Sequence, residues 1–141
     1  MGGVGAGVSA IMSLAAAKQS QKAYAAEAQA QMEQAEMAQI EADQQAINRT
    51  AQLNEQLASI SASSAGGGVS VGSSSMINIK RRESKLASQD VSSIKFMGST
   101  KRRNYQLGAK GSKNKGKAAM YKGYADAASS AGNAYNTGMP E

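Results

Sequence analysis

The sequence predicts an all-α protein: a long helical hairpin with a flexible Gly/Ser hinge and small-residue termini, which assembles into an oligomer. The only proline is Pro140, so no proline interrupts a helix before that residue. Three adjacent glycines, Gly66, Gly67 and Gly68, interrupt helix-forming sequence near the middle of the 141 residues. The apolar fraction is largely alanine, with one Phe and no Trp, so a monomer would bury little large apolar surface and would need a partner.

Residues 18–62 are predicted to form one long amphipathic helix, because they are rich in Ala, Gln, Glu and Met. The larger apolar residues recur mainly at steps of three, four or seven, which places them in one stripe. These residues are Tyr24, Met32, Met37, Ile40, Ile47, Leu53, Leu57 and Ile60. A stripe this thin is typical of coiled-coil-like packing and is too sparse for a globular core.

Residues 63–75 are predicted to be the hinge, since glycine carries a large backbone entropy and serine competes for backbone hydrogen bonds. A basic second helix is expected over residues 76–107, with Ser74 or Ser75 as its N-cap. Gly98 should weaken this helix without ending it. Its predicted buried residues, at roughly helical spacing, are Ile79, Leu86, Ile94, Met97 and Tyr105.

Three further segments complete the predicted organisation. Residues 1–17 form an apolar, small-residue N-terminal segment, and residues 124–141 form a C-terminal segment of similar composition. Between the basic helix and the C-terminal segment, residues 108–123 alternate Gly with Lys and are predicted to be a linker. In a hairpin, the two terminal segments would meet at the same end.

Charge is divided between the two halves of the chain. Residues 1–65 hold three cations and six acids, whereas residues 80–122 hold thirteen cations and two acids. The basic half could therefore pair with the acidic helix, with nucleic acid or with anionic lipid.

Enzymatic, metal-binding and cofactor-binding functions are not expected from this composition. The sequence has no His and no Cys, which removes the commonest general base and the commonest metal ligands. The run "GVGAG" at 3–7 lacks the preceding strand and the following Lys-Ser or Lys-Thr of a phosphate-binding loop. The methionines suit adaptable packing better than a metal site. Since no cation precedes Lys18, a secretory signal is not predicted, and synthesis in the cytoplasm is expected.

Two "KRR" runs, 21 residues apart, are the candidate phosphate-contacting or lipid-contacting sites. This spacing places them on similar helix faces. They could be a solvated face that pairs with the first helix, or they could contact DNA phosphates or lipid headgroups. Tyr105 is the only aromatic residue beside them, so any DNA contact should be independent of base sequence. The candidate residues are Lys80, Arg81, Arg82, Lys101, Arg102 and Arg103.

The uncharged run from Val4 to Ala17 is shorter than the roughly 20 residues that a membrane-spanning helix needs. It could be a packing element at the N-terminus. Alternatively, several copies could associate through their small residues and insert together into a bilayer. The candidate membrane or packing residues are Val4, Val8, Ile11, Met12 and Leu14.

Two short elements carry a resemblance to a known family. "GSSSMINIKRR" at 72–82 and "STKRRNYQ" at 99–106 follow a small-residue N-terminus and an Ala- and Gln-rich helix. In this order they resemble the small internal virion (DNA-ejection) proteins of short-tailed podovirus phages. The matching positions are Gly72, Ser74, Ser75, Met76, Ile79, Lys80 and Arg81, followed by Arg102, Arg103, Tyr105 and Gln106.

The resemblance implies a non-enzymatic protein of the virion interior, located in the core near the portal. Its implied partners are further copies of itself, other internal virion proteins, the portal and the packaged DNA. It would leave with the genome, reach the host cell envelope and help to form a channel across the outer membrane. Two alternatives remain from the residues themselves: a sequence-independent DNA-binding or packaging accessory protein, and a structural adaptor of the phage neck or tail.

Overall fold

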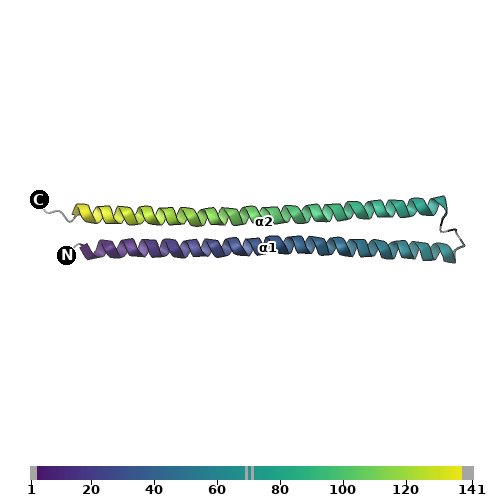
Figure 1. Cartoon of the computed structure of the whole chain (residues 1–141), viewed down its shortest axis with the longest axis horizontal. Helices are drawn as coiled ribbons and strands as arrows, with labels where there is room; N and C mark the ends of the chain where they lie inside the picture. The colour runs from purple at the N-terminus through teal and green to yellow at the C-terminus, as the bar shows by residue number, and fades with distance from the viewer. Residues whose placement is uncertain (1–2, 69, 71, 138–141) are drawn as a thin grey trace. The chain divides into compact units, whose positions relative to one another are not determined.

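In the computed structural model, the chain is all-helical and its two long helices pack together as a hairpin (Figure 1). Helix α1 spans Gly3–Gly66 and helix α2 spans Ser74–Thr137. The structure describes the backbone of residues 3–68, 70 and 72–137, and the side chains of residues 11–68, 70 and 72–132. The all-helical, hairpin-like arrangement predicted from the sequence is therefore confirmed.

The chain forms two compact units, and each pairs one half of α1 with one half of α2. The terminal unit comprises Met1–Glu33 and Tyr105–Glu141, and the turn unit comprises Gln34–Asn104. The N-terminal and C-terminal segments thus belong to one unit, in agreement with the expectation that they meet in a hairpin.

The predicted linker at residues 108–123 is wrong, because α2 continues through it to Thr137. Glycine disfavours a helix by about 1 kcal/mol relative to alanine. Here Ala109, Ser112, Gly116 and Gly123 are buried against α1, so tertiary packing offsets the poor helix propensity. The predicted N-terminal boundary at residue 17 is also absent, since α1 runs unbroken from Gly3.

Helix α1 ends in a glycine turn. The amide of Gly67 donates to the carbonyl oxygen of Ser63 at 3.0 Å, which continues the helical pattern for one residue. Gly68 then adopts a φ of 72°, the left-handed conformation that commonly ends a helix. Of the three predicted hinge glycines, only Gly68 has a positive φ.

Helix α2 begins with a serine N-cap. The backbone amide of Met76 donates to the Oγ of Ser73 at 3.4 Å, and the amide of Ile77 donates to the Ser73 carbonyl oxygen at 3.0 Å. The N-cap is therefore Ser73 and not the predicted Ser74 or Ser75.

Replacing Gly68 with alanine is expected to lower the free energy of unfolding by about 1 to 2 kcal/mol, because a Cβ is disfavoured at positive φ. The matched control is Gly66→Ala, which should raise stability by about 0.5 to 1 kcal/mol, since Gly66 is helical and nothing lies within 4 Å of an added Cβ. Urea denaturation followed by circular dichroism measures both. A Gly68→Ala chain as stable as the Gly66→Ala chain would contradict a positive φ at Gly68.

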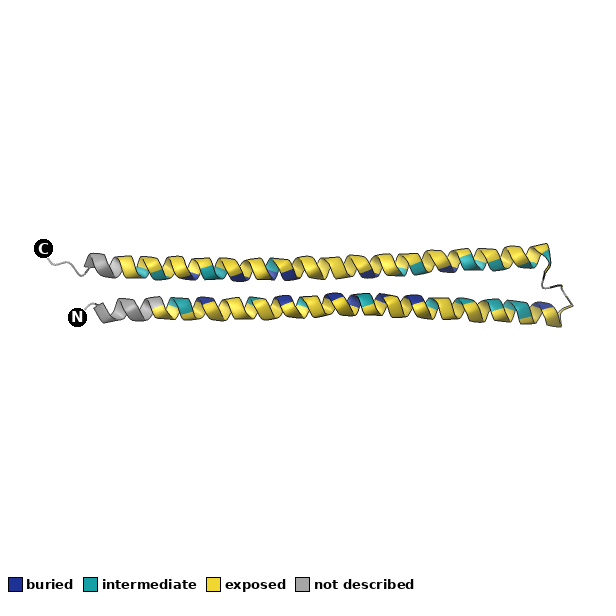
Figure 2. Cartoon of the chain, viewed as in Figure 1, coloured by how far each residue is buried: buried dark blue, intermediate teal, exposed yellow. Residues whose placement is uncertain are grey.

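The contact between the helices is a seam of small residues, here called the small-residue seam. Figure 2 shows the buried residues on the sides of α1 and α2 that face each other in each unit. Among the described residues, every buried apolar side chain is alanine. The seam consists of Ala17, Ala28, Ala35, Ala38, Ala42 and Ala46 on α1 and of Ala87, Gly98, Ala109, Ser112, Gly116 and Gly123 on α2.

Glycines in the seam allow the two backbones to approach closely. In the turn unit, a Cβ added to Gly98 would overlap the Cβ of Ala42. In the terminal unit, a Cβ added to Gly123 would overlap the Cβ of Ala17, and one added to Gly116 would lie 3.2 Å from the Cβ of Tyr24. The distance between the helices is therefore set by residues with little or no side chain.

The predicted stripe of the first helix is divided: Tyr24, Leu53, Leu57 and Ile60 are half-buried, whereas Met32, Met37, Ile40 and Ile47 are exposed. Met37, Ile40 and Ile47 are exposed at 67%, 67% and 61% of their surface, while the alanines between them are buried. On α2, four of the five predicted buried residues are exposed, and only Ile94 is half-buried. Where the backbones approach most closely, at Gly98 and Gly123, there is room only for a methyl group or a hydrogen, so larger side chains are excluded at these points.

Candidate assembly and phosphate-binding surfaces

The outer face of α1 in the turn unit carries an apolar stripe. Met37, Ile40 and Ile47 are spaced by three and seven residues, which places them on one face of the helix. At about 100° per residue, this face is roughly opposite the one that Ala38 and Ala42 direct at α2. The stripe is therefore accessible to a partner.

The outer face of α2 in the turn unit is basic and carries one aromatic side chain. Phe96 is 71% exposed and lies two residues from both Ile94 and Gly98, which face α1. Two residues correspond to about 200° of rotation, so Phe96 points away from α1. Lys85 and Arg103 lie eleven residues before and seven residues after Phe96, on the same face.

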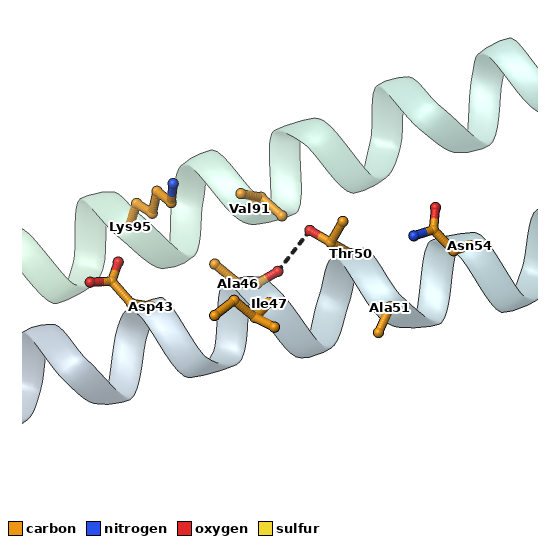
Figure 3. Close-up of a pocket in the computed structure, with 8 residues that line it drawn as sticks. All are labelled: Asp43, Ala46, Ile47, Thr50, Ala51, Asn54, Val91 and Lys95. Carbon is orange, nitrogen blue, oxygen red and sulfur yellow. Dashed lines mark hydrogen bonds between the residues drawn. The ribbon is translucent and has the colours of Figure 1, made fainter.

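An open groove of about 520 Å³ runs between the helices of the turn unit (Figure 3). Ile47, which also belongs to the apolar stripe, and Val91 provide apolar lining, so the groove extends to the outer face of α1. The two charged lining residues are Asp43 and Lys95, one on each helix. The hydroxyl of Thr50 is occupied, since it donates to the carbonyl oxygen of Ala46 at 2.9 Å.

The two predicted basic clusters both lie on α2 of the turn unit. Lys80 is half-buried, and the other five side chains are exposed. Across the residues with described side chains, the one ion pair joins Arg49 to Asp90 at 2.8 Å, with Arg49 Nε also donating to Asp90 Oδ2 at 2.9 Å. Its cation is on α1 and its acid on α2, the reverse of the predicted pairing. Lys80, Arg81, Arg82, Lys101, Arg102 and Arg103 are therefore available for contacts with an anionic partner.

Cations continue along α2 into the terminal unit, through residues 108–123, which the sequence did not predict to be helical. From Val91 to Ala125, α2 has nine Lys and Arg residues and no Asp or Glu, and all nine side chains are exposed. The sequence signal is the seven-residue spacing of Ala109, Gly116 and Gly123, which keeps a small face toward α1 and leaves the lysines outside.

In the N-terminal segment, Ile11 and Met12 are exposed at 69% and 68%, and Leu14 is half-buried. The side chains of Val4 and Val8 lie outside the described residues. Within the part of the chain that the structure describes, neither helix has a stretch long and apolar enough to span a bilayer. Over the same residues, His, Cys, Asp and Glu form no group that could hold a metal ion.

Comparison with known proteins gives no match: no family model, no curated protein and no solved structure resembles this chain significantly.

Proposed function

We propose that this chain is a non-enzymatic virion protein of the ejection type, which assembles inside a phage particle and leaves with the genome. The observation that supports this most is the division of its apolar residues. Small residues hold α1 against α2, while Met37, Ile40, Ile47 and Phe96 lie on outer faces. Exposed apolar surface of this kind marks contact sites for other proteins or membranes.

The resemblance of residues 72–82 and 99–106 to small internal virion proteins supplies the location and partners in this proposal. The protein occupies the core near the portal together with other internal virion proteins, close to packaged DNA. After ejection it acts in the host cell envelope, where several copies help to form a channel across the outer membrane.

Membrane insertion in this proposal is cooperative. The uncharged segment 4–17 is shorter than the roughly 20 residues of a spanning helix, so several copies must insert together. Purified full-length chain is therefore expected to release dye from vesicles with a rate that rises more steeply than in proportion to protein concentration. Absence of leakage at all anionic and neutral lipid compositions tested would contradict the membrane role.

The alternative, sequence-independent DNA binding, is favoured by the nine exposed Lys and Arg residues that α2 carries from Val91 to Ala125 without any Asp or Glu. Each phosphate contact releases a counterion, so binding should weaken with salt with a slope of about 0.9 per contact. The same affinity is expected for duplexes of different sequence, because lysine contacts to phosphate carry no base information.

Changing Lys80, Arg81, Arg82, Lys101, Arg102 and Arg103 to glutamine is expected to weaken duplex binding and to reduce its salt slope. The reduction should be about 0.9 for each side chain that contacts phosphate. Fluorescence anisotropy at several salt concentrations measures both. A second variant, with three changed cations against six, changes Lys110, Lys113 and Lys117 to glutamine instead. A parental slope in the first variant and a reduced slope in the second would assign the DNA contact to the C-terminal part of α2.

A further inference from the structure

We propose that the turn unit binds a second copy of this chain side by side, with the outer face of α1 in one copy against the outer face of α2 in the next. The inference rests on the self-assembly included in the proposed function and names its contact surface. The acidic face consists of Glu36, Met37, Ile40, Ile47 and Glu55 on α1. The basic face consists of Lys85, Phe96 and Arg103 on α2.

The two faces are complementary in charge. Both carry exposed large apolar side chains, with Ile40 and Ile47 on one and Phe96 on the other. Glutamates accompany the isoleucines, while a lysine and an arginine accompany the phenylalanine. Like faces would bring like charges together, so the favoured contact joins unlike faces.

The register within one copy predicts which residues would meet. Ala42 lies level with Gly98, since a Cβ on Gly98 would overlap that of Ala42. The helices are antiparallel, so Phe96, two residues before Gly98, lies level with Gln44. In a neighbouring copy at the same height, Phe96 would therefore enter the space between Ile40 and Ile47.

The same register brings the charges together. Arg103 is five residues beyond Gly98, which places it level with Met37 and beside Glu36. Lys85 is five residues before Asp90, whose partner is Arg49, so it lies level with Glu55 to within one residue. One apolar contact and two opposite-charge contacts thus fall at matching heights without any sliding of the copies.

This contact joins the acidic face of one copy to the basic face of the next. Each pair therefore still has one free basic face and one free acidic face, to which further copies can bind. Such a heterologous contact produces a ring where the rotation closes and an open array where it does not. The apolar contact around Phe96 provides affinity, while the rim charges select the orientation.

Cysteine cross-linking tests the contact, because the sequence has no Cys of its own. Ala51 lies four residues beyond Ile47, and Gln89 lies seven residues before Phe96; both are exposed and level to within one residue. Mixed Ala51→Cys and Gln89→Cys chains are expected to give a covalent dimer on oxidation that neither variant gives alone. A dimer formed mainly by Ala51→Cys alone would overturn the proposal, since that product requires two acidic faces to meet.

Sedimentation of the full chain separates failure of this contact from failure of the proposed function. The Phe96→Ala variant is expected to weaken self-association at least tenfold, whereas the control Tyr121→Ala, which removes a side chain 74% exposed in the terminal unit, should not change it. An oligomeric parent chain without the mixed cross-link would overturn this contact but leave the proposed assembly standing. A parent chain that is monomeric at all concentrations would overturn both.

Discussion

The Gly98→Leu variant is expected to lose about 3 kcal/mol of unfolding free energy, a large part of the 5 to 15 kcal/mol typical of a small protein. Even a single methyl group at this position would overlap the Cβ of Ala42, and the Ala38 carbonyl oxygen would lie 3.5 Å from it. Neither atom can rotate away, because one is a Cβ and the other belongs to a helix backbone. The two helices of the turn unit would have to separate, which exposes the alanines of the small-residue seam.

Two controls separate this effect from the helix propensity of the new residue. Gly111→Leu introduces the same side chain into α2 at a position where nothing lies within 4 Å of an added Cβ, and it should be neutral or stabilising by up to about 1 kcal/mol. Combining Gly98→Ala with Ala42→Gly exchanges the methyl group between the helices. In this double variant the gain in helix propensity at position 98 cancels the loss at position 42. Urea denaturation should therefore give nearly the parental free energy of unfolding. A Gly98→Leu chain as stable as the Gly111→Leu chain would rule out the close approach at this point.

The Ile11→Asp variant is expected to abolish vesicle leakage if the N-terminal segment enters the bilayer. A carboxylate at the centre of a membrane costs about 2.5 to 3.5 kcal/mol, which is about a hundredfold loss of insertion for each copy. The effect is repeated in every copy of a cooperative assembly. Because Ile11 is 69% exposed, the change should leave the helix pair folded, as circular dichroism would verify.

The control for this prediction is Ile77→Asp, which makes the same substitution at an exposed isoleucine of α2, far along the sequence from the apolar segment. It should leak like the parent chain. Parental leakage by Ile11→Asp would show that residues 4–17 do not enter the membrane and would favour the alternative that they are a packing element. Loss of leakage in both variants would point to a general effect of added negative charge.

The small-residue seam was less predictable than the helices themselves. Only half of the large apolar residues at helical spacing on α1 are even half-buried, whereas Ala35, Ala38 and Ala42 are fully buried. Alanine is abundant throughout α1, so its spacing gives a weak signal. The glycines of α2 were likewise interpreted as helix-weakening or linker residues, because propensity alone takes no account of a neighbouring backbone.

The candidate surfaces were predictable in part. Both "KRR" runs could be found in the sequence, and five of their six side chains are exposed. The sequence could not show whether these side chains form ion pairs with the acidic helix, because the pairing depends on which residues face each other across the hairpin. That the lysines beyond residue 107 lie on a helix could not be predicted either, because packing of the small residues of this segment on α1 stabilises the helix there.

The sequence by itself determined that the chain is helical, that it reverses once and that its basic half differs from its acidic half. These properties are local: proline and glycine act on their own backbone, and charge can be counted along the chain. The tertiary structure decided where the helices end, which face of each is buried and which apolar residues remain outside. These outcomes depend on the distance between α1 and α2 within each unit. That distance is small because Gly98, Gly116 and Gly123 have no side chain where they meet α1. It therefore depends on which residues of the two helices face each other, which cannot be read from either helix alone.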